Sequence, residues 1–242
     1  MKSSADAHFD QIYGTRARDY HELVSREDMQ GNLPRALWEV ADFRGKTVIE
    51  LGAGTGRVTR ILAPLAGQVL AFDRSRHMLE RAGAFLSEEI KRNVRLAEAD
   101  NRAVPLPDAS AEILIEGWSF GHSVSREGGD WKKAAQEILD ECTRLVKPGG
   151  TIILIETLGT GHRAPHPPGP HLPLFFAWLQ EERGFAMKWI RTDYLFESLA
   201  KTRELVEFFF GQMVEHEVLA SGEVVVPECT GIWWKVNQGG SC

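Results

Sequence analysis

Short apolar runs alternate with amphipathic stretches through the middle of the chain. Between the runs, apolar residues recur three and four positions apart, as on one face of a helix, at Val58, Ile61, Leu62 and Leu65. Ser75 and Asp130 stand where they can cap two of these helices. The runs that predict strands are 47–51, 68–72, 94–99, 111–117 and 151–157. Strands that alternate with helices are typical of a mostly parallel sheet covered on both faces, so the sequence predicts a doubly wound α/β fold.

The segments on either side of this alternation follow other patterns. Residues 5–30 predict one or two loose helices, and a firmer helix follows with Asn32 as its expected cap. After the fifth strand, a stretch rich in Gly and Pro predicts a loop at 159–173. The remainder predicts a short helix (174–183), an extended segment (188–196), a helix capped by Gly211 and two final strands (213–220 and 230–236).

These patterns predict a single domain built from four parts. Residues 1–44 form an N-terminal helical cap and 45–157 the core of alternating strands and helices. Residues 158–196 are an insertion after the fifth strand, and long segments of this kind often form lids over a site. Residues 197–242 supply a final helix and an antiparallel strand pair.

Composition and charge exclude some classes of protein. The 242 residues are 43% hydrophobic and 26% charged, with a formal charge of −6 and no run of basic residues, which argues against a nucleic-acid partner. No apolar run approaches the ~20 residues of a membrane helix, and the N-terminus lacks a signal-peptide pattern, so we expect no membrane partner and a cytoplasmic location. The cysteines fit neither a disulfide nor a metal pattern, and Cys142 is expected to be a buried hydrophobe.

A glycine-rich loop follows the first predicted strand, in the sequence VIELGAGTGR (48–57). Gly52, Gly54 and Gly56 let the backbone turn tightly and let a ligand approach closely. The triplet alone is also compatible with an ordinary turn between a strand and a helix. Dinucleotide sites space their glycines as G-x-G-x-x-G, whereas this loop reads G-x-G-x-G, which disfavours a nicotinamide cofactor.

Two carboxylates follow the loop at the ends of the next strands. Asp73 ends the second strand, where it can accept hydrogen bonds from both hydroxyls of a ribose. Asp100 ends the third, followed by Asn101, where an acceptor can meet an adenine amine. Ligands of such sheets bind outside the carboxyl ends of the strands, so the loop and both aspartates converge on one crevice shaped for adenosine.

At these positions the chain resembles a known family. VIELGAGTGR, VLAFDRSRHML, LAEADNRAVPLPDASAEILI and RLVKPGGTIILIE look like the successive motifs of class I S-adenosylmethionine-dependent methyltransferases, nearest to the small-molecule group called type 11. The resemblance covers about residues 45–157 and makes them a cofactor-binding core. It implies a Rossmann-like, seven-stranded, mostly parallel sheet whose last strand is antiparallel, supplied by the terminal strand pair.

The resemblance also implies roles for individual residues. Glu50 and the loop from Gly52 through Ala53 and Gly54 to Gly56 would hold the methionine part of the cofactor. Asp73 would bind the ribose, Asp100 and Asn101 the adenine, and Met78 would pack near the adenine. Arg74 departs from the family, which usually has an apolar residue there, and its guanidinium can stack on the adenine instead.

The end of the fourth strand, in ILIEGWSFGHS (113–123), is expected to face the reacting methyl group. Gly117 would give the cofactor clearance, and Trp118 would place its ring near the positive sulfur or the acceptor. His122 is a candidate general base because histidine titrates near neutral pH. The alternative is a histidine that caps the following loop and does not touch the substrate. Glu156 can orient His122 or bind an amine, or it can be hydrogen-bonded scaffold, as can Glu116.

Substrate contacts are expected from the parts outside the core. Tyr20 in the N-terminal cap and Tyr194 in the insertion are candidate lid residues, and Tyr194 has simple core packing as its alternative. Three histidines of the insertion were considered as metal ligands, but their spacing is irregular and no carboxylate or cysteine accompanies them, so no metal site is predicted: His162, His166 and His171.

The sequence therefore favours an enzyme that transfers a methyl group from S-adenosyl-L-methionine to a small-molecule acceptor. The acceptor atom is expected to be oxygen or nitrogen, and the product S-adenosyl-L-homocysteine. One alternative is a non-catalytic protein that binds or senses an adenosyl ligand on the same fold. A less favoured one is an NAD-dependent oxidoreductase. The sequence carries no prediction of the oligomeric state.

Overall fold

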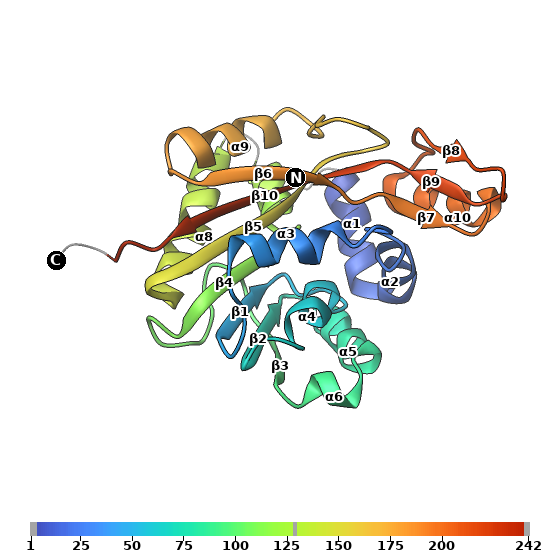
Figure 1. Cartoon of the computed structure of the whole chain (residues 1–242). Helices are drawn as coiled ribbons and strands as arrows, with labels where there is room; N and C mark the ends of the chain where they lie inside the picture. The colour runs from blue at the N-terminus through green and yellow to red at the C-terminus, as the bar shows by residue number, and fades with distance from the viewer. Residues whose placement is uncertain (1–3, 128–129, 240–242) are drawn as a thin grey trace.

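The computed structural model describes residues 4–127 and 130–239, which are built around one central seven-stranded sheet (Figure 1). The strands lie in the order β3-β2-β1-β4-β5-β10-β6. β10 runs antiparallel to both of its neighbours, and the other strands run parallel to one another. This confirms the predicted doubly wound sheet with an antiparallel last strand. The bounds are β1 Thr47–Leu51, β2 Gln68–Asp73, β3 Val94–Glu98, β4 Ala111–Gly117, β5 Val146–Thr160, β6 Ala186–Arg191 and β10 Glu228–Val236.

Helices cover the two faces of this sheet because alternate residues of each strand point to opposite sides. In β5, Ile153 and Ile155 pack with α3 (Asn32–Val40), α4 (Arg57–Leu62) and α5 (Arg76–Phe85). Ile152 and Leu154 pack on the other side with α7 (Phe120–Glu127), α8 (Trp131–Leu145) and α9 (Leu172–Glu181). The short α6 (Glu88–Lys91) precedes β3. The sheet thus separates two apolar layers.

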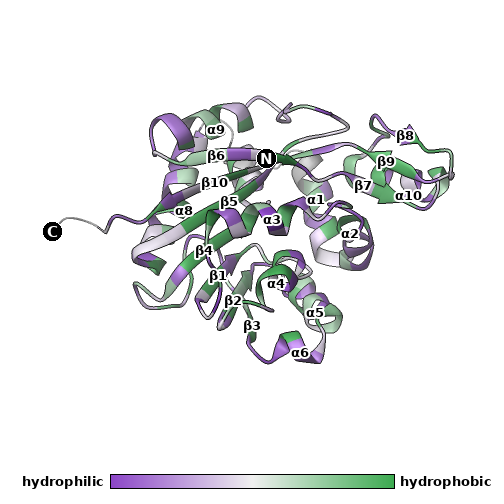
Figure 2. Ribbon diagram, in the orientation of Figure 1, coloured by the Kyte–Doolittle hydropathy of each residue, from purple (hydrophilic) through white to green (hydrophobic). Residues whose placement is uncertain are grey.

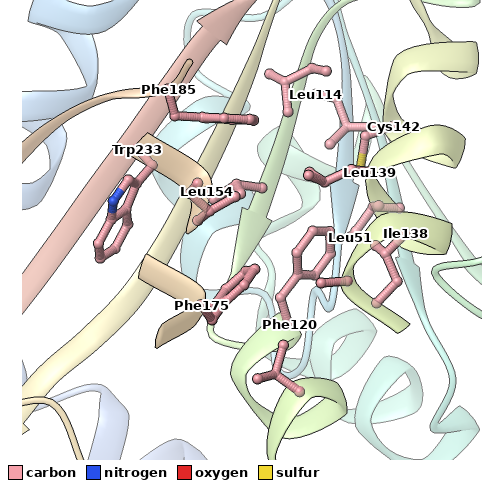
Figure 3. Packing of buried hydrophobic residues seen from close by; sticks show 14 of the residues in the cluster. Leu51, Leu114, Phe120, Ile138, Leu139, Cys142, Leu154, Phe175, Phe185 and Trp233 are labelled. Carbon is pink, nitrogen blue, oxygen red and sulfur yellow. The ribbon is translucent and has the colours of Figure 1, made fainter. Parts of the chain in front are cut away.

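Figure 3 shows the layer under α7, α8 and α9. Leu114 and Leu154 of the sheet meet Phe120, Phe175 and the apolar stripe of α8. Cys142 lies within this cluster with 0% of its surface exposed, as the sequence predicted for a small buried hydrophobe. Cys229 is also buried, and Cys242 lies outside the described residues.

A smaller unit sits beside the sheet and was only partly predicted. Three short strands, β7 (Tyr194–Phe196), β9 (Val224–Val226) and β8 (Glu217–Val218), pair in the order β7-β9-β8. They pack with α2 (Ala17–Val24) and α10 (Leu199–Phe210) in a third apolar cluster. These elements lie together at one end of the molecule in Figure 1, and the hydrophobic colouring of Figure 2 runs along β7 and β9.

This unit corrects the predicted strand pair at the end of the chain. The strand expected at 213–220 shrinks to β8, which pairs with β9 and does not enter the main sheet. The edge of the main sheet is formed by β6, from the segment expected to be insertion. The extended segment 188–196 divides between the two sheets at Thr192 and Asp193, whose carbonyls accept from Asp28 and Met29.

Helix caps agree with the sequence at some ends only. The Ser75 hydroxyl accepts from the Met78 N–H, and Gly211 ends α10 with a φ of 76°. Asp130 occupies the cap position of α8 without a side-chain capping bond. Asn32 is not the cap of α3 but its first residue, and Asp28 performs that role: its two carboxylate oxygens accept from the backbone N–H groups of Asn32 and Leu33, at 2.8 and 2.9 Å.

We expect Asp28→Ala to lower the free energy of unfolding by about 1 kcal/mol, because it removes both capping acceptors from α3. Urea denaturation measures this difference. Asp140→Ala, which removes the same charge from the exposed side of α8, is the matched control and should not lower stability. Equal stability of the two variants would show that Asp28 contributes nothing as a cap.

Within residues 4–127 and 130–239, no helix is both long and apolar enough to cross a lipid bilayer.

Candidate active site

The glycine loop between β1 and α4 has the backbone conformation that its sequence predicts. Gly52, Gly54 and Gly56 have φ values of 69°, 53° and 82°, in the left-handed region that side chains disfavour. A Cβ on Gly52 would lie 2.5 Å from Ser119 Cβ, so only glycine fits between β1 and the end of β4. The loop folds back over β2, because the Ala53 N–H donates to the Phe72 carbonyl at 2.9 Å.

Asp73 ties this loop to the end of β2. Its Oδ2 accepts from the Gly54 N–H at 2.8 Å, and its Oδ1 accepts from the Ser75 N–H at 2.7 Å. Partial burial raises the pKa of the carboxyl, whereas these two bonds oppose the rise. Each oxygen keeps a further lone pair that can accept from a hydroxyl.

Asp100 and Asn101 follow β3 and border the same cleft as the glycine loop. The Arg102 guanidinium donates to both oxygens of Asp100, at 3.0 Å each, and lowers the pKa of its carboxyl. The Asn101 amide donates to the Ser119 hydroxyl at 3.0 Å. Asp100 is half exposed and already paired, so its oxygens are less available to a ligand than those of Asp73.

A single cleft contains most of the residues expected to hold a cofactor. It encloses about 820 Å³ of empty space that opens to solvent. Its lining includes Gly52, Gly54, Asp73, Arg74, Met78, Asp100, Asn101, Gly117 and Trp118. Sequence positions up to 66 residues apart therefore meet at the carboxyl ends of the strands, as expected for a parallel sheet of this kind.

Glu50 is not in that lining. Its side chain is 1% exposed and lies beneath the loop, where both oxygens accept from Thr59, one from the N–H at 3.1 Å and one from the hydroxyl at 2.6 Å. Burial raises the pKa of Glu50 to about 8. The carboxylate therefore joins β1 to α4 and supports the loop from below. Ala53 is buried, and Gly56 faces Leu86 rather than the cleft.

Helix α1 (Ser4–Thr15) lies along the cleft and supplies a residue that the sequence did not single out. The Tyr13 hydroxyl is hydrogen-bonded to His122 Nε2 at 2.8 Å, and the Tyr13 carbonyl accepts from the Ser75 hydroxyl. Asp10 pairs with Arg74 at 2.8 Å, so Arg74 is held by α1. The only sequence signal for Tyr13 was that it lies seven residues before Tyr20, on the same expected helix face.

A second, larger cavity adjoins the cleft and encloses about 1940 Å³ of empty space. Four residues border both the cleft and the larger cavity: Tyr13, Tyr20, Trp118 and His122. His122 lies in the first turn of α7. The two cavities therefore meet at an aromatic boundary that carries one imidazole.

The comparisons with known proteins agree with this architecture. Residues 49–154 match the model of a family described as a methyltransferase domain. The demethylmenaquinone methyltransferase of Lactococcus lactis is 29% identical over 153 residues, which make up 61% of this chain and 57% of that protein. The YcgJ protein of Bacillus subtilis aligns at a TM-score of 0.56 and 16% identity, over 87% of this chain and 100% of that one. Residues 49–154 are therefore similar to a methyltransferase domain, and the fold is one that solved methyltransferase structures share.

A further solved structure, an S-adenosylmethionine-dependent methyltransferase from Aquifex aeolicus, shares this fold with a TM-score of 0.52. It is 17% identical and covers 86% of this chain and 94% of its own. At such identities the likeness concerns the fold. The chain spans about half the length of the curated relatives it matches.

Trp118, at the boundary between the two cavities, has an unusual backbone. Its φ is 54°, a left-handed value that costs a residue with a side chain about 1–2 kcal/mol. The Arg57 guanidinium lies 4.1 Å from the centre of the Trp118 ring and pairs with Glu27 at 2.6 Å. Strained residues cluster at ligand sites, where the surrounding structure holds them in place.

Two buried carboxylates cap α7 next to this boundary. Glu116 Oε1 accepts from the Phe120 N–H at 2.9 Å, and Glu156 Oε1 accepts from the Gly121 N–H at 2.6 Å. Burial raises the pKa of Glu116 to about 7, and burial together with Glu116 raises the pKa of Glu156 well above its ordinary value. These contacts correspond to the scaffold alternative, although Glu156 also borders the larger cavity.

The remaining candidates border the larger cavity. Tyr194 is 6% exposed, and its ring is stacked with Phe196 at 6.0 Å, so it both packs in the small apolar cluster and reaches the cavity. The rings of His162 and His166 lie 4.3 Å apart in the cavity wall. Over the described ranges, 4–127 and 130–239, no group of three or more His, Cys, Asp or Glu side chains is arranged to hold a metal ion.

Proposed function

We propose that the protein is an enzyme that transfers a methyl group from S-adenosyl-L-methionine to a small-molecule acceptor, at oxygen or nitrogen, and releases S-adenosyl-L-homocysteine. The observation that supports this most is the shared boundary between the cleft and the larger cavity. A ligand in each would meet the other at Trp118 and His122. A protein that only bound an adenosyl ligand would not need a second cavity open to that point.

The residues of the cleft fit such a cofactor. The positive φ values of the glycine loop leave its surface free of side chains. Asp73 offers two oxygens, each with one backbone donor, to a pair of ribose hydroxyls. Met78 and Asn101 border the side on which an adenine would rest. When bound, S-adenosylmethionine supplies a methyl group activated by its positive sulfur.

The protein contributes chiefly by positioning. Methyl transfer between two bound molecules requires close and aligned reacting atoms, and alignment of this kind is worth up to ~7–11 kcal/mol. Trp118, clamped between the strained end of β4 and Arg57, gives a fixed surface for that alignment. Tyr20, which burial gives a pKa of about 12, remains a neutral phenol at the same boundary.

We assign His122 the role of general base: with Nε2–H donating to the Tyr13 hydroxyl, Nδ1 would take the proton that the acceptor loses. Its Nε2 is held by the Tyr13 hydroxyl at 2.8 Å, so the imidazole keeps one orientation at the boundary. A positioned general base contributes about 10²–10⁴-fold when the nucleophile must lose a proton. Tyr13 acts through His122 by fixing the orientation of its ring.

We expect His122→Ala to lower turnover at least about tenfold, because the acceptor proton loses its base. S-adenosylhomocysteine affinity should change little, since His122 borders the cleft only where it meets the larger cavity. The measurement is S-adenosylhomocysteine release with a panel of small phenols and amines, scored on the acceptor that the native enzyme turns over. His216→Ala, at an exposed position, is the control. Undiminished turnover in His122→Ala would remove the residue from the mechanism, and binding without transfer to any acceptor would favour the sensing alternative.

A further inference from the structure

The larger cavity has more acidic than basic side chains in its lining. Three carboxyl groups border it, from Glu27, Glu156 and Glu228, whereas Arg57 is the one guanidinium or ammonium group among its described lining residues. Arg57 is already neutralised by Glu27, at 2.6 Å, in a pair whose side chains are 13% and 3% exposed. The other two carboxyl groups, of Glu156 and Glu228, have no guanidinium or ammonium partner of their own within the described lining, and burial raises the pKa of each, so that a bound cation would favour their charged forms.

Glu228 has an unused acceptor. It begins β10 and is 2% exposed. Its Oε1 accepts from the Thr157 hydroxyl at 2.7 Å. Its Oε2 is buried and makes no hydrogen bond within the described part of the chain. Burial, together with the nearby Glu27, raises the pKa of this carboxyl to about 8, and a cation bound beside Oε2 would lower that pKa and favour the charged form. A buried carboxyl oxygen without a donor is costly, which makes this atom a place where a ligand donor would bind.

Aromatic rings form another part of the lining. Phe209 lies 5.4 Å from Phe9 and 5.7 Å from Tyr20, measured between ring centres, and Tyr194 borders the cavity near Glu228. Aromatic faces attract cations, and this attraction grows where water is excluded. Carboxyl groups and aromatic rings together are the surroundings that a desolvated ammonium group requires.

We propose that the methyl acceptor is a basic amine that binds as a cation, with Glu228 as its counter-ion. The proposal rests on the proposed function and names the chemical class of its acceptor. The ammonium group is bound at Glu228 Oε2, and the atom that is methylated lies elsewhere on the molecule, toward Trp118 and His122.

Arg57 does not reverse this preference. Its Nη2 also has no hydrogen-bond partner among the described residues, but its positive charge is shared with Glu27 and with the ring of Trp118. An anion at this nitrogen would face the carboxyl groups of Glu27 and Glu228 as well. We expect Nη2 to donate a hydrogen bond to a neutral oxygen of the acceptor, while Glu228 binds the ammonium group of the same molecule.

The test uses three probes of nearly the same shape: naphthylmethylamine, naphthylmethanol and naphthoate. Each is titrated by calorimetry at pH 7 into the full-length protein saturated with S-adenosylhomocysteine. We expect the amine to bind at least tenfold more tightly than the alcohol, and naphthoate to bind no better than the alcohol. Equal affinities of amine and alcohol, no binding of the amine, or a preference for naphthoate would overturn the proposal.

The Glu228→Gln variant then tests whether Glu228 is the cause of the preference for the amine. Glutamine keeps an acceptor for Thr157 but removes the charge, so the amine should lose at least tenfold in affinity while the alcohol changes less than twofold. Glu181→Gln, which removes a charge from the exposed end of α9, should leave both affinities unchanged. Retention of the amine preference in Glu228→Gln would exclude Glu228 as the counter-ion. A titration of the protein with S-adenosylhomocysteine alone, done before the probes are added, separates the two proposals. If S-adenosylhomocysteine does not bind, the proposed function is contradicted. If it binds but the amine is not preferred, only the class of acceptor is contradicted.

Discussion

Asp73→Ala is expected to weaken S-adenosylhomocysteine binding at least about 100-fold. The carboxylate offers acceptors to two ribose hydroxyls, and hydrogen bonds to charged groups contribute about 1.5–3 kcal/mol each. The loss of both therefore corresponds to about 3 kcal/mol or more, and each 1.4 kcal/mol is about a factor of ten. The same substitution also frees the Gly54 and Ser75 N–H groups, which loosens the glycine loop.

Calorimetry on matched variants separates this role from a general loss of charge. Asp73→Asn keeps the shape and one oxygen and should fall between the native protein and Asp73→Ala. Asp100→Ala should weaken S-adenosylhomocysteine binding about tenfold or less, because the Asp100 carboxylate is half exposed and already accepts hydrogen bonds from Arg102. Asp140→Ala, far along α8, should change nothing. An affinity of Asp73→Ala within about threefold of native would contradict the placement of the ribose.

Trp118→Ala is expected to lower turnover at least about 100-fold. The residue borders both cavities, and a misplacement of about 1 Å at a reacting centre can cost that much. Trp118→Phe keeps an aromatic face and should lose less. Turnover of Trp118→Ala near the native value would show that the ring does not position the acceptor.

The same position allows backbone strain to be measured apart from packing. Alanine at a φ of 54° retains the strain, whereas glycine adopts this conformation freely. In urea denaturation, the free energy of unfolding of Trp118→Gly should therefore be about 1 kcal/mol higher than that of Trp118→Ala. Both variants lose the ring and the activity. If the alanine variant is the more stable of the two, the backbone there is not strained.

The sequence predicted those parts of the fold that depend on local patterns. Strands such as 111–117 are apolar runs with clear ends, and they appear as predicted in β4. Extended structure was expected around β6 and β8, but their partners were not predicted, because β8 has only two residues and β6 shows no clear alternation of burial that would assign it to a sheet. The Asp28 cap was not predicted either, because it depends on a left-handed backbone at a residue four positions before the first residue of the helix.

The sequence also predicted the position of some residues of the candidate site and not of others. Residues on the glycine loop and at the strand ends could be placed because parallel strands bring their carboxyl ends together. Tyr13 could not, since its bond to His122 joins positions 109 residues apart and depends on how α1 crosses the cleft. The position of Glu50 likewise depends on α4, whose Thr59 binds both of its oxygens.

The most direct test of the account is a calorimetric titration of the protein with S-adenosylhomocysteine and, separately, with NAD. The account predicts that S-adenosylhomocysteine binds with one molecule per chain, and that NAD shows no binding at the same concentrations. Tight binding of NAD together with no binding of S-adenosylmethionine or S-adenosylhomocysteine would contradict it.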